Sequence, residues 1–177
     1  MKIFKIAQSK IEVPPEMGTI PIPSGNVRLF HYTRGNIDDI KNNGLSLSHA
    51  QGSKYGEPDM IWGSTDLNEY KNMADYKNIV EYSVPAQDID FPSKIREDLN
   101  EWNKRSHHVG IFRDIKPNEI LAIHEPWHHH YRYIEKNKEL LQEVINGEHD
   151  DLMNGRFPNE GKAIEALKNN YKHLTKI

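Results

Sequence analysis

The chain has 177 residues, of which 36% are hydrophobic and 28% charged, and a formal net charge of -3 with histidine neutral. This length favours one domain with a real core, while the charge gives no global positive field for nucleic acid, although a local basic patch remains compatible with it. No cysteine is present, which excludes disulfides, thiolate nucleophiles and cysteine zinc sites. No apolar run reaches the roughly 20 residues of a membrane-spanning helix, and "MKIFKIAQSK" lacks a signal-peptide apolar region, so we expect a cytoplasmic protein without a membrane partner.

The first third of the chain predicts an extended lead-in followed by a strand and a helix. Residues 1–26 carry four prolines and two glycines, a composition that does not hold a helix. The next stretch, "NVRLFHYT", is rich in β-branched and aromatic residues and predicts a strand. A short helix follows, with Asn36 as its N-cap and Gly44 at its end.

The middle third alternates predicted strands and helices around polar loops. Residues 46–59 are small and polar and predict a loop. Strands are predicted for "MIWGST", "NIVEYSVPA", "HHVGIFRDI" and "EILAIHE", and helices for "DLNEYKNMADY" and "FPSKIREDLNEWNKR". Predicted strands and predicted helices thus occur in the same region, which indicates an α+β core over residues 27–124.

The last third, residues 125–177, predicts a helical region. One long helix is expected from Pro126 to Gly147, with Trp127, Tyr131 and Ile134 on its apolar stripe, and a second helix from residue 160. The chain is thus expected to have three parts, 1–26, 27–124 and 125–177. Its oligomeric state is left open.

One match to a zinc-protease pattern falls at the boundary of the last two parts. "HEPWH", His124 to His128, fits H-E-x-x-H, but that motif requires both histidines on one continuous helix. Pro126 is not a helix-interior residue, so the helix is expected to begin there and to leave His124 outside it. No metal site is expected, and no dinucleotide, P-loop or G-x-S-x-G motif occurs.

The order of the short motifs carries a resemblance. "HYT", a short helix, "NGL", a glycine-rich loop and "MIWGSTDLNEYKNMADY" follow one another. In this order the chain resembles the ADP-ribosyltransferase superfamily, in the branch with a His-Tyr-Glu triad. The resemblance implies an α+β fold with a split β core, flanking helices and a helical C-terminal region, and it implies NAD as cofactor.

The resemblance assigns roles to individual positions. It implies that His31 and Thr33 hold the ribose and nicotinamide side of NAD, that Trp62 is the first stacking aromatic, and that Tyr70 or Tyr76 is the second. Tyr32 and Ser64, within the same two motifs, are further candidates for substrate binding. An imidazole and a hydroxyl facing two aromatics suit a flat heterocycle that needs stacking and hydrogen bonds.

The third motif departs from the family pattern. The family places a glutamate on a late strand, where "SHHVGIFRDI" offers His107, His108, Arg113 and Asp114 but no glutamate. Glu81, in "IVEYSV", is the nearest strand glutamate but lies one strand earlier. Three interpretations stay open: Glu81 or Asp114 supplies the carboxylate, the chain is a non-catalytic nucleotide-binding relative, or it cleaves a different N-glycosidic bond.

The sequence therefore predicts an enzyme that cleaves an N-glycosidic bond. The first hypothesis is NAD-dependent ADP-ribosyl transfer to a nucleic acid or a protein. The alternative is a DNA glycosylase that uses no NAD and removes a base, for which stacking aromatics and an electrostatic stabiliser are needed. Either substrate carries phosphates, for which the expected cations include Arg28, Arg34 and Arg113.

Overall fold

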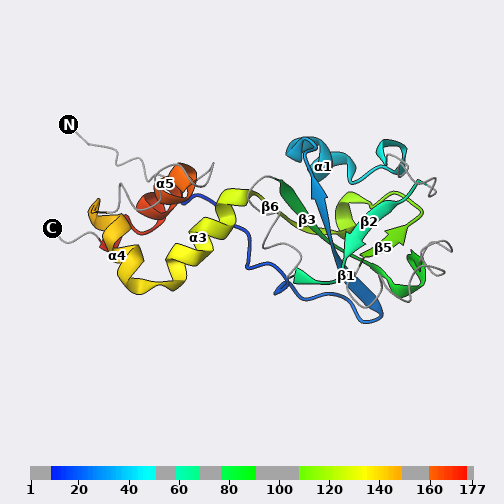
Figure 1. Ribbon diagram of the computed structural model, residues 1–177, viewed down its shortest axis with the longest axis horizontal. Coiled ribbons are helices and arrows are strands. Elements are labelled where there is room, and N and C mark those ends of the chain that lie inside the picture. The colour runs from blue at the N-terminus through cyan, green and yellow to red at the C-terminus, as the bar shows by residue number, and fades with distance from the viewer. Residues whose placement is uncertain (1–8, 51–58, 68–76, 91–107, 149–159, 175–177) are drawn as a thin grey trace, which may run out of the picture. The chain divides into compact units, whose positions relative to one another are not determined.

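The computed structural model describes residues 9–50, 59–67, 77–90, 108–148 and 160–174 (Figure 1). The chain divides into two compact units. We call residues 14–125 the sheet unit, and residues 1–13 together with 126–177 the helical unit. The expected division into residues 1–26, 27–124 and 125–177 stays a prediction, and the boundary between the two compact units falls at residues 13 and 14, within the expected lead-in.

The sheet unit contains a six-stranded sheet with the order β4-β5-β2-β1-β3-β6 among the described residues. The strands are β1 (Asn26–Thr33), β2 (Ile61–Ser64), β3 (Asn78–Pro85), β4 (Ile89–Asp90), β5 (His108–Ile111) and β6 (Ile120–His124). Every pairing between them is antiparallel. All the strands predicted from the sequence are present, and the fold is α+β. Of the two helices expected in the middle third, the one from Phe91 and most of the one from Asp66 lie outside the described residues.

One face of the sheet carries the main apolar core. Alternate residues of β1 and β3, among them Leu29, Val80 and Tyr82, are fully buried there. Helix α1 (Ile37–Asn43) adds Ile40 to the same core. We call this side the helix face of the sheet.

Local signals set the limits of α1 as expected. The side chain of Asn36 accepts hydrogen bonds from the backbone N–H groups of Asp38 and Asp39, which is the N-cap arrangement. Gly44 ends the helix at φ 81°, a left-handed conformation that favours glycine. A Cβ at Gly44 would also collide with the backbone oxygen of Ile115.

The opposite face of the sheet is covered by the N-terminal part of the sheet unit. Phe30 and Ile79 form a small buried cluster there, with Met17 and Tyr32 packed against it. We call this side the Phe30 face.

Short 3-10 helices also occur in the described chain: Leu47–His49, Ala86–Asp88, Pro117–Glu119 and Lys172–Leu174. The first of these lies in the stretch expected to be a loop.

The helical unit contains α3 (Pro126–Lys136), α4 (Lys138–Asn146) and α5 (Glu160–Asn170). The prediction of a single long helix after Pro126 is wrong, because the helix is interrupted at Asn137. The Asn137 side chain accepts from the backbone N–H of Leu140 and so begins a second helix. Of the expected stripe, Trp127, Tyr131 and Ile134 are buried as predicted.

The side chain of Asn170, on α5, is hydrogen-bonded to the backbone of the first described residues. The Asn170 amide accepts from the backbone N–H of Ile11 at 2.8 Å and donates to the backbone oxygen of Ile11 at 3.0 Å. It also donates to the Tyr131 hydroxyl at 3.1 Å. An extended segment without a strand partner in the described chain thus has its backbone polar groups satisfied by a helix side chain.

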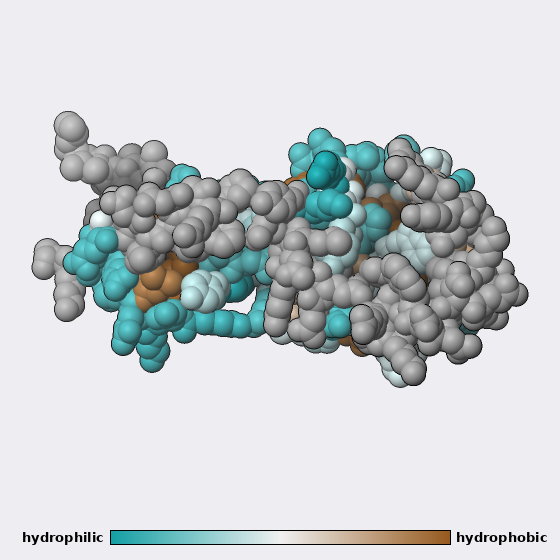
Figure 2. Space-filling model, in the orientation of Figure 1, coloured by the Kyte–Doolittle hydropathy of each residue, from teal (hydrophilic) through white to brown (hydrophobic). Residues whose placement is uncertain are grey.

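The described surface is predominantly hydrophilic in the view of Figure 2, where hydrophobic colour appears in small areas. Four large hydrophobic side chains are exposed in the described residues: Leu67, Phe112, Tyr133 and Leu174. No helix in the described ranges is both long and apolar enough to cross a bilayer.

Candidate functional site

Three strands that the sequence analysis singled out lie side by side. β2 pairs with β1 on one side and with β5 on the other. Phe30 on β1 is opposite Ser64 on β2, and Ser64 is opposite His108 on β5. The strand that carries His31, the strand that carries Trp62 and the late strand are therefore consecutive in the sheet, although they are far apart in the sequence.

His31 is held by the backbone of the neighbouring strand. Its Nδ1 is 2.7 Å from the carbonyl oxygen of Trp62. A carbonyl oxygen only accepts, so Nδ1 carries the proton and donates it. In the neutral imidazole the other nitrogen, Nε2, is then an acceptor, and the ring can receive a hydrogen bond from a ligand hydroxyl.

The environment keeps this imidazole neutral. Burial lowers the pKa of His31 from its ordinary value, the hydrogen bond to Trp62 opposes this, and the positive charge of Lys77 lowers the pKa further. Lys77 directly precedes β3, at the end where β3 runs beside the end of β1. Lys77 was not among the residues expected at the site, because only the pairing of β1 with β3 brings it to His31.

Thr33 lies two residues after His31 on β1, so alternation directs both side chains to the same side of the strand. The Thr33 hydroxyl accepts from the backbone N–H of Gly35 at 2.8 Å. It keeps its own proton for donation. His31 and Thr33 thus offer an acceptor and a donor on one side of β1.

The structure links Trp62 to His31 through its backbone and not through its ring. Trp62 alternates on β2 with Ile61 and Gly63, which face the Leu29 and Tyr82 side of the sheet. The half-buried indole is therefore on the other side of β2. Its stacking role stays a prediction, and the second candidate aromatics, Tyr70 and Tyr76, lie outside the described residues.

Tyr32 and Ser64 have mainly local surroundings. Tyr32 packs against the Phe30 cluster on the opposite side of β1 from His31. Ser64 is buried and accepts from the backbone N–H of Asp66 at 3.1 Å, in the turn that ends β2. Both are close to the site along the chain, but neither is directed to the His31 side of β1 by strand alternation.

Glu81 is not beside His31, and the interpretation of Glu81 as the carboxylate partner of His31 does not fit this arrangement. Glu81 is opposite Phe30 in the β1–β3 ladder, so it faces the Phe30 side of the sheet, whereas His31 alternates to the other side. The Glu81 side chain is fully buried and forms an ion pair with Arg28. Its second oxygen is 2.8 Å from Nε2 of His124, and the first also accepts from the backbone N–H of Gly18.

Arg28 is committed to the same buried group. Besides Glu81, it donates to the backbone oxygen of Ile20. Arg28, Glu81 and His124 therefore join β1, β3 and β6 and hold the segment around Gly18 against the Phe30 face. The expectation that Arg28 binds phosphate is not supported by this placement.

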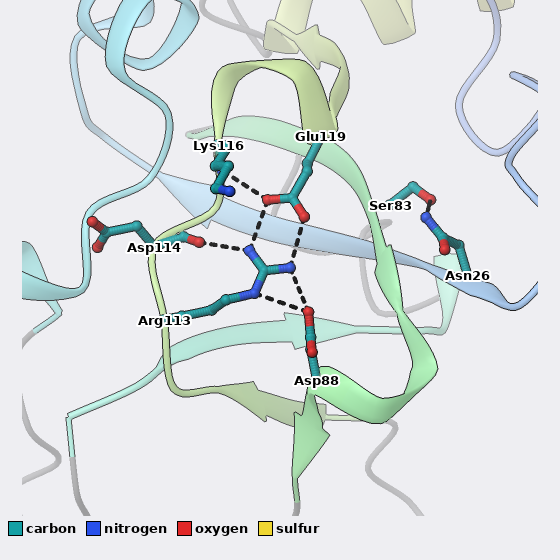
Figure 3. Close-up of polar contacts among 7 residues, drawn as sticks. All are labelled: Asn26, Ser83, Asp88, Arg113, Asp114, Lys116 and Glu119. Atoms are coloured by element: carbon teal, nitrogen blue, oxygen red, sulfur yellow. Dashed lines mark hydrogen bonds and ion pairs between the residues drawn. The ribbon is translucent and has the colours of Figure 1, made fainter.

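Arg113 has all five of its N–H groups engaged (Figure 3). It donates to the carboxylates of Asp88 and Glu119, and to the backbone oxygen of Asp114. Hydrogen bonding to Glu119 raises the pKa of Arg113, and the same contact lowers the pKa of Glu119. Arg113 fixes the turn after β5 and has no donor left for a substrate phosphate.

Asp114 is likewise used within the fold. Its Oδ1 accepts from the backbone N–H of Leu47 at 2.6 Å. Beside it, Leu45 and Ile115 exchange two backbone hydrogen bonds of 2.9 Å. The role of Asp114 as a catalytic carboxylate stays a prediction, and for His108 the structure gives the start of β5 and the pairing with Ser64.

The zinc-protease pattern lacks its helical context, as predicted. His124 ends β6 and binds Glu81, whereas α3 begins at Pro126. His128 is buried with its ring 4.0 Å from that of Trp127. The described residues contain no group of three or more histidine, aspartate or glutamate side chains arranged to hold a metal ion.

Comparisons with known proteins add no family assignment. No protein-family model, curated protein or solved structure matches the chain.

Proposed function

We propose that the protein cleaves a C1′–N glycosidic bond, most readily as NAD-dependent ADP-ribosyl transfer to a nucleic acid or a protein. One observation carries the proposal. Nδ1 of His31 donates to the Trp62 carbonyl and burial lowers the pKa of the imidazole, on a strand that pairs with the aromatic strand, whose other neighbour is the late strand. This juxtaposition agrees with the order of motifs that gave the resemblance to ADP-ribosyltransferases.

The residues around His31 fit a nucleotide of the NAD class. Nε2 of His31 accepts a hydrogen bond from a ribose hydroxyl, and the Thr33 hydroxyl donates one. Arg34 and Lys77 are cations for phosphate groups. The indole of Trp62 leaves β2 on the other side from His31, so its stacking on a heterocycle is tested separately, by Trp62→Ala. When bound, NAD would supply a ribose bearing a good leaving group.

The role of His31 is to bind and orient. The bond from Nδ1 to Trp62 prevents the ring from turning, so the acceptor at Nε2 has a fixed direction. A neutral ring at physiological pH keeps that acceptor available, and the lowered pKa extends this state to more acidic conditions.

A second function is favoured by the placement of the carboxylates. Glu81 faces the other side of the sheet, and Asp114 binds the backbone of Leu47, so neither is directed to a ribose hydroxyl beside His31. Deoxyribose lacks the 2′-hydroxyl, and its glycosidic bond breaks through a similar cationic sugar. A DNA glycosylase that excises a modified base without NAD is therefore the second candidate.

The experiment assays both reactions with the same preparation. The purified full chain is incubated with NAD and with protein or nucleic acid acceptors, and nicotinamide release is followed by chromatography. In parallel, it is incubated with DNA containing normal and modified bases but no NAD, and alkali-labile sites are counted. NAD cleavage supports the transferase, whereas alkali-labile sites without NAD support the glycosylase.

Three variants connect the activity to the site. His31→Ala should abolish whichever reaction is found. Trp62→Ala keeps the carbonyl that holds His31, so it tests the indole alone and should weaken heterocycle binding by about 1–3 kcal/mol if the ring stacks. Lys138→Gln, an exposed position in the helical unit, is the control and should change nothing. Nucleotide binding without turnover would instead indicate a non-catalytic binding module, and neither binding nor turnover would contradict the proposal.

A further inference from the structure

Two cations leave the sheet at the end of β1 that carries His31. The last pair of the antiparallel β1–β3 ladder is Thr33 with Asn78. Arg34 is the next residue beyond this pair on one strand, and Lys77 is the next on the other. The register of the ladder therefore places two positively charged residues as backbone neighbours at the His31 end of the β1–β3 pair, which we call the corner.

Neither cation is neutralised by another residue that the structure describes. Arg34 is exposed and Lys77 is partly exposed, and neither makes an ion pair or a side-chain hydrogen bond in the part of the chain that the structure describes. Like charges on neighbouring positions of two strands repel each other. An anion bound between them would remove this repulsion.

The other described arginines behave differently. Arg28 is paired with Glu81, Arg113 with Asp88 and Glu119, and Arg132 with Glu135. Each of these guanidinium groups is used inside the fold. Arg34 is the exception among the described arginines, which separates it from residues with a structural role.

The closest carboxylates along the chain do not fill this position. Asp38 and Asp39 are in the first turn of α1, where Asp39 accepts from the side chain of Asn43. Glu125 follows the last residue of β6, the strand on the other side of β3. Neither Arg34 nor Lys77 forms an ion pair with any of these three acids in the described ranges.

The corner interacts electrostatically with the candidate site. The charge of Lys77 is close enough to His31 to lower the pKa of the imidazole. His31 and Thr33 lie within the last three residues of β1, and Arg34 directly follows the strand. A ligand group at the corner is thus within reach of a ligand that also contacts His31.

We infer that Arg34 and Lys77 together bind a phosphate group of the substrate that occupies the His31 site. The inference rests on the proposed function and specifies it, since it assigns phosphate recognition to these two side chains and not to Arg28 or Arg113. A guanidinium presents paired N–H donors to phosphate oxygens, and an ammonium adds a compact point charge. The phosphate is either the pyrophosphate of a dinucleotide or a backbone phosphate of a nucleic acid, and the two sources are separated by the test.

The test measures binding by calorimetry for wild type, Arg34→Gln, Lys77→Gln and the double variant of the full chain. The probes are ADP-ribose, a short DNA oligonucleotide and adenosine, which lacks a phosphate. We expect each single substitution to raise the Kd of one phosphate-bearing probe about tenfold, and the double variant to raise it further, because each removes a charge-assisted hydrogen bond. Adenosine binding should not change.

The oligonucleotide arm has its own signature. If the phosphate belongs to DNA, the dependence of log K on log salt should become shallower by roughly 0.7–0.9 for each phosphate that the variant no longer binds. Lys138→Gln removes the same charge from the helical unit and should leave both Kd values unchanged, so it controls for net charge. A change restricted to ADP-ribose assigns the corner to a dinucleotide, and a change restricted to DNA assigns it to the nucleic acid backbone.

Three results would overturn the inference: a double variant that binds both phosphate probes as wild type does, an equal loss in Lys138→Gln, or a wild type that binds neither probe at millimolar concentrations. Its failure is distinguishable from that of the proposed function. If wild type and double variant cleave substrate equally well, phosphate binding by Arg34 and Lys77 is contradicted and the proposed reaction is supported. If phosphate binding depends on these two residues but no glycosidic bond is cleaved, phosphate binding is supported and the proposed reaction is contradicted.

Discussion

Nδ1 of His31 donates to the carbonyl oxygen of Trp62 at 2.7 Å, and this bond joins a side chain of β1 to the backbone of β2. The orientation of the imidazole therefore depends on the path of β2 and not on the identity of the residue at position 62. Any side chain there leaves the carbonyl in place. The hydrogen bond joins the two motifs through the backbone of β2, while the indole and the imidazole leave their strands on different sides of the sheet.

The partly buried imidazole of His31 should make stability depend on pH. Its pKa in the folded protein is lower than the ordinary value of about 6.5, so the unfolded chain binds the proton first as the pH falls. This contribution to stability is fully present above about pH 6.5 and is lost below it, by about 1.4 kcal/mol per pH unit until the folded pKa is reached. Urea unfolding at about pH 7.5 and about pH 5.5 should show a larger loss for wild type than for His31→Gln. Equal losses would mean that His31 does not titrate as described.

Glu81 should matter for stability and not for catalysis. Glu81→Ala leaves Arg28 without its carboxylate in a largely buried position, and breaking such a pair lowers the free energy of unfolding by about 3–5 kcal/mol. Glu81→Gln keeps the size and part of the hydrogen bonding, so its effect should be smaller. Denaturant unfolding gives the stability, and the glycosidic-bond assay gives the activity of the folded fraction. A folded Glu81→Gln protein without activity would place Glu81 in the reaction after all.

Gly63 and Tyr82 should show a compensating pair of substitutions. A Cβ at position 63 would collide with the Tyr82 hydroxyl and come within 3.1 Å of Cβ of Leu29, so Gly63→Ala should cost about 1–3 kcal/mol. The Tyr82 hydroxyl is buried and has no hydrogen-bond partner in the described structure. Tyr82→Phe should therefore be neutral or stabilising, and it should recover part of the loss in the double variant. A double-mutant cycle from thermal or urea unfolding measures this coupling, and strictly additive effects would contradict the packing described.

Asn170 should hold the first described residues in place. Asn170→Ala removes both hydrogen bonds to the Ile11 backbone and the one to the Tyr131 hydroxyl, which should lower stability by about 1–3 kcal/mol. Hydrogen exchange at the Ile11 amide should accelerate at the same time. Asn169→Ala is the matched control, because Asn169 is more exposed and makes one longer bond of 3.3 Å to Ser9. Unchanged exchange at Ile11 in Asn170→Ala would show that other contacts hold the segment.

The sequence alone determined the local elements, because their signals act over a few residues. Asn36 and Gly44 define α1 through hydrogen bonds and backbone conformations within the helix ends. α3 begins at Pro126, so His124 of the zinc-protease pattern lies outside the helix. The same local logic missed the break at Asn137, since the apolar stripe continues through it and gave no reason to end the helix there.

Only the tertiary structure decided which residues share a site. Strand order and register set whether a side chain faces His31, and both arise from contacts between segments far apart in the chain. A register fixed by the whole sheet turned Glu81 to the Phe30 face and brought Lys77 to the end of β1 beside Arg34. Arg113 and Asp114 looked equally available in the sequence, but folding gave Arg113 two carboxylate partners and Asp114 a backbone partner. Residue type and position in the sequence identified His31 as a candidate site residue. Its hydrogen bond to Trp62 follows only from the pairing of two strands.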